Sequence, residues 1–243
     1  MDFDEYGDPK QHTIVMLHGA AATDTFANQY CLSQTYHLVI PHLSGAGRAV
    51  DKPYEPQHEL DELTAFIGAL GQQKVTLVGH SLGAELAVAL VSKHPELFDR
   101  AVFMSAWVCA SPKSVQKFVR MAKYTSFTLR WSWMVYLQGK YWGYTDAQAK
   151  RMAEYAAKIP RSTYLAWFQN RIYLNDLPTY ATVTIPMLAV CGDREIMEMK
   201  DSIAQLGRRN PNCKTVMLKG ANHDFPMRKA KETTLLLQQF LKA

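Results

Sequence analysis

One stretch of the chain decides how the rest is interpreted: Val75-Thr76-Leu77-Val78-Gly79-His80-Ser81-Leu82-Gly83-Ala84-Glu85-Leu86-Ala87. Its first four residues favour a strand, and a helical segment begins directly after Gly-His-Ser-Leu-Gly. The turn between them must be sharp, and the flanking glycines remove side chains that would clash as strand and helix approach each other. The stretch therefore predicts a corner with an exposed Ser81 hydroxyl, the form in which serine can act as a nucleophile. An inert tight turn is the alternative.

The composition indicates a folded chain with an extensive core. Of its 243 residues, 48% are apolar and 20% are charged, so disorder is not expected. The acidic N-terminus lacks the apolar segment of a secretory signal, and no apolar run reaches the length of a membrane span. The four cysteines are scattered without metal-like or redox spacing. We therefore expect a cytoplasmic protein with reduced thiols, no integral membrane segment and, since no nucleic-acid-binding motif is present, no nucleic-acid partner.

Strand-like and helical segments alternate along most of the chain. The predicted strands cover 13–17, 36–40, 75–78, 101–104, 185–190 and 215–218, and the predicted helical stretches cover 26–34, 59–70, 82–93, 200–207 and 228–241. This alternation predicts an α/β fold with a mostly parallel, doubly wound sheet and helices on both faces. Residues 107–183 interrupt it with helical stretches and no clear buried strand. We therefore predict a core of residues 1–106 and 184–243 with an inserted helical cap at 107–183.

The insert is aromatic and basic. It holds all five tryptophans, and its eleven Lys and Arg residues face only three Asp and Glu residues. The rings can pack the cap helices together, or some can line an apolar pocket, for which Trp107, just past a predicted strand end, is the best candidate. The cations can be simple solvated charge. An anionic partner is the alternative: an acyl carrier, a coenzyme A thioester or a phospholipid surface.

A general base for Ser81 is expected later in the chain, and His223 is the one histidine after residue 185. It lies in a loop just after the last predicted strand. A lone histidine is often structural, but catalytic groups gather at the carboxyl edge of a parallel sheet. An orienting acid is expected after the preceding strand, where both Asp193 and Glu195 are placed to support the imidazole. Asp193 could instead be a turn residue and Glu195 a surface charge.

A loop of small residues follows the first long strand, Leu17-His18-Gly19-Ala20-Ala21-Ala22. Small side chains let a backbone N–H approach a substrate oxygen, and the residue after the nucleophile, Leu82, supplies a second N–H. We interpret His18 as a brace for this loop without a role in the chemistry.

Taken together, these motifs resemble the α/β-hydrolase superfamily, in its small serine-esterase branch with a helical cap. The matching segments occur in the family's order and the resemblance covers residues 13–241; they are Leu17-His18-Gly19, Gly79-His80-Ser81-Leu82-Gly83, Gly192-Asp193-Arg194-Glu195 and Gly220-Ala221-Asn222-His223. A serine at the corner excludes the aspartate-nucleophile branches. Two departures are a loop at 42–49 without the family's inner histidine and final serine, and opening strands that are missing or reduced to 2–6.

The resemblance implies roles for individual residues. Ser81 would be the nucleophile and His223 the base, with the N–H groups of Ala20 and Leu82 as the oxyanion hole. The family's acid stands three residues after the strand-end glycine, which favours Glu195 over Asp193.

Two further residues, Trp107 and Ala21, are assigned to substrate binding. The expected activity is hydrolysis of a small-molecule carboxylic ester with a small to medium apolar acyl group, through an acyl-enzyme and without a metal or organic cofactor. A thioesterase acting on an anionic carrier is one alternative. A non-hydrolytic member of the superfamily, a lyase or a ligand receptor, is the other.

Overall fold

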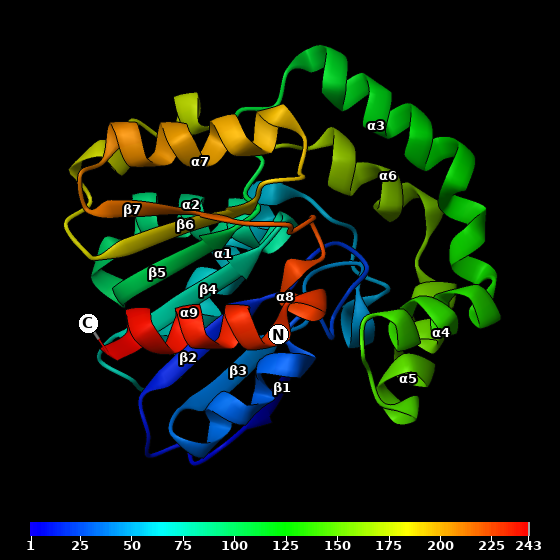
Figure 1. Cartoon of the computed structure of the whole chain (residues 1–243), viewed down its shortest axis with the longest axis horizontal. Coiled ribbons are helices and arrows are strands. Elements are labelled where there is room, and N and C mark those ends of the chain that lie inside the picture. The colour runs from blue at the N-terminus through cyan, green and yellow to red at the C-terminus, as the bar shows by residue number, and fades with distance from the viewer. Residues whose placement is uncertain (243) are drawn as a thin grey trace.

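Seven strands form one sheet in a computed structural model that describes residues 1–242 (Figure 1). Their order is β1-β3-β2-β4-β5-β6-β7, and only the edge strand β1 is antiparallel to its neighbour in this part of the chain. The strands are β1 Phe3–Tyr6, β2 Thr13–Leu17, β3 His37–Pro41, β4 Val75–His80, β5 Phe98–Met104, β6 Met187–Gly192 and β7 Cys213–Leu218. The predicted mostly parallel α/β sheet is confirmed, with the opening strands reduced to β1.

Alternating side chains of the buried strands supply the two faces of the sheet. In β2, Val15 and Leu17 pack into one apolar cluster, and Ile14 and Met16 pack into the other. The first cluster is covered by α1 Pro56–Gly68, α2 Leu82–Lys93 and α7 Met197–Arg209. The second is covered by η1 Ala27–Gln34 and α9 Ala230–Lys242, which is red in Figure 1. The sheet is therefore doubly wound, as predicted.

Several predicted boundaries move for local reasons. The helix predicted at 59–70 begins at Pro56, because the Glu55 carboxylate accepts a hydrogen bond from the His58 N–H at 2.7 Å and proline suits the first turn. The segment predicted as helical at 26–34 is a 3-10 helix. The last helix, predicted at 228–241, is α9 Ala230–Lys242, and the short helix α8 Phe225–Arg228 precedes it. The remaining short 3-10 turns are η2 Gly47–Ala49, η3 Pro95–Leu97, η5 Leu174–Asp176 and η6 Pro178–Thr182.

Residues 107–183 form helices at one end of the molecule, beside the carboxyl ends of the parallel strands (Figure 1). These helices are α3 Pro112–Thr125, η4 Ser126–Arg130, α4 Ser132–Tyr141, α5 Asp146–Lys158 and α6 Arg161–Gln169. No helix within residues 1–242 is both long and apolar enough to cross a membrane. The division into a core and a separate cap stays a prediction.

Polar contacts tie these helices to the sheet. The Arg151 guanidinium of α5 forms an ion pair with the buried Asp24 carboxylate. The Trp167 indole N–H of α6 donates to the Ser44 carbonyl at 3.2 Å. On α7, Glu198 accepts a hydrogen bond from the Ser111 hydroxyl at 2.6 Å, at the residue that caps α3. The insert therefore has a defined position over the sheet edge.

The corner between β4 and α2 is closely packed. A side-chain Cβ at Gly83 would overlap the Leu17 backbone of β2, and one at Gly79 would overlap the Gly83 backbone. The approach of helix to strand at the corner is therefore possible only with glycine at both positions.

A Gly83→Ala substitution is expected to destabilise the fold by about 1–3 kcal/mol. The added methyl group would meet backbone atoms of Leu17 and His18, which cannot move aside as a flexible side chain could. The matched control is Gly68→Ala at the end of α1, where nothing lies within 4 Å of an added Cβ. That substitution should stabilise the protein slightly, by about 0.5–1 kcal/mol. Urea unfolding of both variants measures the difference, and an equal effect of the two would contradict the packing argument.

Candidate active site

Ser81 occupies the tip of the corner in a strained backbone conformation. Its φ of 54° and ψ of −117° lie in a region that residues with a side chain rarely adopt. The Ser81 N–H donates to the Met104 carbonyl at 2.8 Å, which anchors the turn to the neighbouring strand β5. Although Ser81 precedes α2, its hydroxyl does not cap that helix. The hydroxyl is therefore available to another partner.

That partner is His223, in the loop between β7 and α8. The His223 Nε2 lies 3.0 Å from the Ser81 Oγ, and its Nδ1 lies 2.8 Å from the Glu195 Oε2. Since the carboxylate can only accept, Nδ1–H donates to Glu195, and Nε2 accepts the hydrogen bond of the Ser81 hydroxyl. This is the tautomer that a general base for Ser81 requires.

Glu195 is buried and fully hydrogen-bonded. Its Oε1 accepts the Gly192 N–H and the Ser105 hydroxyl, both at 2.8 Å, while Oε2 accepts the His223 Nδ1–H. Burial alone would raise the pKa of Glu195, but the hydrogen bond and charge of His223, with the other donors, lower it to about 2. The carboxylate is therefore ionised at neutral pH and oriented toward the imidazole.

Asp193, the alternative acid, forms its side-chain hydrogen bond with the backbone and not with His223. Its Oδ1 accepts the Ala221 N–H at 3.2 Å, two residues before His223. Hydrogen bonds from the Gly220 and Ala221 backbone lower the pKa of Asp193. Asp193 therefore orders the loop that carries His223, and Glu195 is the carboxylate that meets the imidazole.

Two other histidines near the site serve as structural supports. The His80 Nε2–H donates to the His223 carbonyl at 2.9 Å, and burial followed by the nearby His223 lowers the pKa of His80 to about 3. The His18 Nδ1–H donates to the Gly19 carbonyl at 2.8 Å, and Nε2 accepts the Leu43 N–H at 3.1 Å. Burial lowers the pKa of His18 to about 4, so both rings are neutral at pH 7. His18 thus braces its loop as expected.

The predicted oxyanion donors, Ala20 and Leu82, both lie in the wall of the cavity that contains Ser81. Within residues 1–242, neither backbone N–H donates a hydrogen bond to the protein. Ala22 also lines this cavity, whereas Ala21, which was assigned to substrate binding, does not. Ala21 instead adopts a positive φ of 58°, which turns the loop between its two neighbours.

The cavity has a volume of about 560 Å³, and its lining combines aromatic and aliphatic side chains with the charged residues Arg171, Arg194 and Asp224. Its aromatic residues are Trp107, Phe118, Trp142, Trp167 and Phe168. All five lie within residues 107–183, so this segment covers the cavity over Ser81. Within residues 1–242, no group of three or more His, Cys, Asp and Glu side chains is placed to hold a metal ion.

Trp107 is held on three sides. Its indole N–H donates to Glu198 at 2.9 Å, its ring packs edge-on against Phe118 with centroids 4.9 Å apart, and the Arg171 guanidinium lies 4.6 Å from its centroid. Arg171 is buried and forms an ion pair with Glu85, one turn after Ser81 in α2. Burial lowers the pKa of Arg171 to about 10, which leaves it charged. The ring is therefore a rigid part of the cavity wall.

Sequence reasoning missed Ser105 and the Arg171–Glu85 pair. Ser105 follows β5 and donates to Glu195, so its place after a strand at the same sheet edge was a usable signal. The residues of the ion pair lie far apart in the sequence, and no local pattern connects them.

The sequence matches the profile of the alpha/beta hydrolase family over residues 14–234, and the chain belongs to this family. It is 25% identical over 205 residues to a 2-(acetamidomethylene)succinate hydrolase of Mesorhizobium japonicum, covering 79% of this chain and 73% of that protein. Over 99 residues it is 31% identical to a 2-hydroxymuconate semialdehyde hydrolase of Pseudomonas putida, covering 38% of this chain. The match spans only 35% of the length of the Pseudomonas protein.

Solved structures share the fold over nearly the whole chain. An enol-lactonase from Burkholderia xenovorans has a TM-score of 0.80 at 16% identity, covering 100% of this chain and 96% of that one. A thermophilic esterase from Thermogutta terrifontis has a TM-score of 0.76 at 17% identity, covering 99% and 92%. At this identity the likeness establishes the fold.

The hydrogen bonds of Glu195 predict acid sensitivity. Its pKa of about 2 lies below the ordinary value of 4.5, so its contribution to folding is complete above pH 4.5 and is lost as the pH falls toward 2. A shift of this size corresponds to about 3 kcal/mol. Urea unfolding at a series of acidic pH values should show this loss in the wild type and a flatter profile in Glu195→Gln. Parallel profiles would contradict the assignment.

Proposed function

We propose that this chain hydrolyses carboxylic esters through an acyl-enzyme formed on Ser81. The observation that carries the proposal is the continuous line of contacts from the Ser81 hydroxyl through His223 to the buried Glu195, with a spacing of 3.0 and 2.8 Å. A nucleophile, a base and a group that orients the base are the three parts required for serine-based acyl transfer. Membership of the alpha/beta hydrolase family and the hydrolase names of two relatives support the reaction class.

In the first half of the reaction, the Ser81 proton passes to the His223 Nε2 as Oγ forms a bond to the ester carbonyl carbon. The negative charge that develops on the carbonyl oxygen is accepted by the N–H groups of Ala20 and Leu82. Each such donor contributes on the order of 3 kcal/mol to stabilisation of the transition state. The carbon–oxygen bond to the leaving alcohol then breaks, and His223 returns its proton to that alcohol.

In the second half, water attacks the acyl carbon and gives a proton to His223. The bond to the Ser81 Oγ breaks, the carboxylic acid leaves, and the proton returns to the serine. Glu195 stabilises the imidazolium in both halves, because its ionised carboxylate lies 2.8 Å from Nδ1.

The cavity defines the class of acyl group. Five Trp and Phe side chains, with Leu82, Ile196, Met199 and Met227, line a volume of about 560 Å³, which suits a small to medium apolar acyl chain. In this proposal residues 107–183 act as a cap whose aromatic residues cover the acyl group, and Trp107 contacts it. A thioesterase would use the same residues, and the basic composition of the insert is the feature that favours an anionic thioester carrier.

Ser81→Ala is expected to abolish hydrolysis of p-nitrophenyl acetate and butyrate, because no other hydroxyl occupies the tip of the corner. A fluorophosphonate should label the wild type on Ser81 and leave the variant unlabelled, as mass spectrometry of the digested protein would show. Equal activity of the two proteins would refute the serine-hydrolase proposal.

A panel of esters and thioesters of rising chain length identifies the substrate class in the same wild-type preparation. Higher kcat/KM for oxygen esters supports the esterase, and higher values for thioesters support the alternative. A lyase or a receptor predicts no turnover of either series.

Glu195→Gln should lower kcat by about 10⁴-fold, because an amide in place of the carboxylate no longer stabilises the imidazolium and favours the wrong tautomer. Asp193→Asn is the matched control, since it also replaces a carboxylate by an amide, two residues before Glu195, at a side chain that bonds to the Ala221 N–H and not to His223. We expect a far smaller loss there. Steady-state kinetics of both variants decide the acid, and a larger loss in Asp193→Asn would move that role to Asp193.

A further inference from the structure

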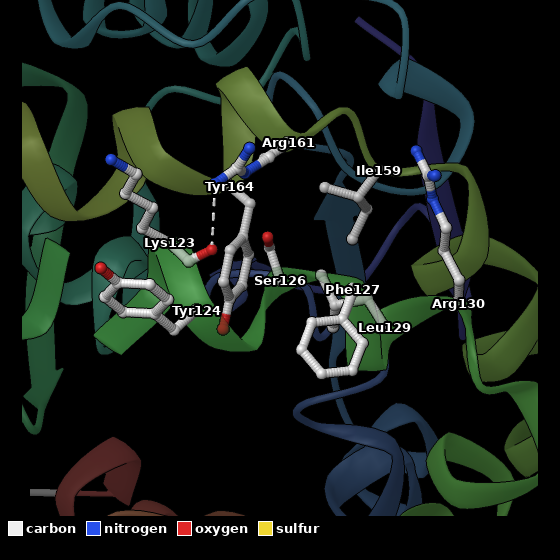
Figure 2. A pocket seen from close by; sticks show the side chains of 9 residues that line it. All are labelled: Lys123, Tyr124, Ser126, Phe127, Leu129, Arg130, Ile159, Arg161 and Tyr164. Atoms are coloured by element: carbon white, nitrogen blue, oxygen red, sulfur yellow. Dashed lines mark hydrogen bonds between the residues drawn. The ribbon is translucent and has the colours of Figure 1, made fainter. Parts of the chain in front are cut away.

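A second hollow lies on the insert, away from Ser81, and is lined by cations and aromatic rings. Its volume is about 370 Å³. Figure 2 shows its lining side chains, which are Lys123, Tyr124, Ser126, Phe127, Leu129, Arg130, Ile159, Arg161 and Tyr164. The lining contains three cations and no carboxylate. A neighbouring hollow shares Lys123 and Tyr124 and adds Arg120, so positive charge continues along α3.

The rings around this hollow are unusually exposed to solvent. Tyr124 is 69% exposed, and Phe127 and Trp131, whose centroids lie 5.2 Å apart, are exposed as well. On the adjoining α4, the exposed residues Trp133, Leu137 and Tyr141 recur every four positions along one side of the helix. α3 and α4 lie at the same end of the molecule (Figure 1). Several large, exposed apolar side chains on one segment are typical of a surface that binds a protein or a membrane.

The charge of the same segment has one sign. Between residues 107 and 145 the sequence contains no Asp or Glu, while its cations are Lys113, Lys117, Arg120, Lys123, Arg130 and Lys140. Of these six, only Lys140 forms an ion pair within residues 1–242, with Asp146 at 2.7 Å. The positive charge beside the hollow is therefore not neutralised by the protein.

The catalytic cavity does not account for this surface. Phe118 of α3 lines the cavity over Ser81, whereas Lys123 and Tyr124 line the second hollow, and the two linings share no residue. α3 therefore presents one set of side chains to the cavity and another to solvent. The outward set has no partner in the described structure and needs another explanation.

We propose that the basic–aromatic face, defined as Lys123, Tyr124, Phe127, Arg130, Trp131, Trp133 and Arg161, docks on the surface of an anionic phospholipid membrane. Tyr and Trp side chains favour the boundary between head groups and acyl chains, and Lys and Arg beside them attract anionic lipids. Lys123, Arg130 and Arg161 line different parts of the hollow and would each face lipid head groups (Figure 2). The binding is peripheral and does not depend on hydrolysis at Ser81.

Co-sedimentation of the full chain with phosphatidylcholine vesicles, with and without phosphatidylglycerol, tests the proposal. The wild type should bind the phosphatidylglycerol vesicles, bind phosphatidylcholine alone weakly, and dissociate as salt is added. Lys123→Gln with Arg130→Gln should weaken binding about 30-fold, since each cation near an anionic leaflet contributes roughly a fivefold factor. Tyr124→Ser with Trp133→Ser should weaken binding at high and low salt alike.

The matched control lies on α9, which packs against the sheet through the second apolar cluster and is not part of the insert. Lys231→Gln with Leu235→Ser removes a cation and a 57%-exposed apolar side chain there, and it should leave vesicle binding unchanged. All variants should keep the thermal melting temperature of the wild type, because the substituted side chains are exposed. Absent binding to phosphatidylglycerol vesicles, or an equal loss in the α9 control, would overturn the proposal. Binding to an acidic acyl carrier protein without vesicle binding would overturn it in favour of a protein partner.

Discussion

The contact of α2 with β2 at Gly83 positions everything in the site. Because the helix approaches the strand this closely, the chain at Ser81 must turn with a φ of 54°, and the serine hydroxyl projects from the corner. Hydrogen bonds between successive strand ends extend this order along the sheet edge. The Ser81 N–H donates to β5, the Ser105 N–H to β6 and the Asp193 N–H to β7, at 2.8, 2.8 and 3.0 Å. Ser81, Glu195 and the loop that carries His223 are thus held in a common frame.

Burial of charge determines how the imidazole is held. Glu195 remains ionised in the interior because three donors, among them the Nδ1–H of His223, satisfy its two oxygens. His80 supports the same loop in the opposite electrostatic state, since burial keeps its ring neutral while it donates to the His223 carbonyl. A second imidazolium beside His223 would compete for the charge of Glu195. The neutral His80 avoids this conflict.

Helix α3 presents different side chains to the cavity over Ser81 and to solvent. α3 must supply Phe118 to the cavity over Ser81, and Glu198 keeps its first turn in place through Ser111 and Ser114. Its outer side carries Lys123 and the exposed Tyr124, which do not line that cavity.

Much of this arrangement was predictable from local pattern. The period of apolar residues indicated the α/β sheet and the helical insert, and the turn chemistry around Ser81 indicated its exposed hydroxyl. His223 was identifiable because it is the one histidine after residue 185 and follows a strand. Each of these features depends on residues that are close together in the chain. The residues that local pattern did not reveal, such as Ser105 and Arg171, have partners far away in the sequence.

The sequence by itself determined the fold class, the sharp corner at Ser81 and the chain order of the candidate site residues, because periodicity and turn chemistry are local properties. The spacing from Gly192 favoured Glu195 over Asp193, but only the tertiary structure showed that the Glu195 carboxylate meets His223 while Asp193 meets the Ala221 N–H. It also placed Ser105 on Glu195, and it left Ala21 outside the cavity that its neighbours line. These outcomes depend on how strand ends and loops pack in space, which no short stretch of sequence encodes.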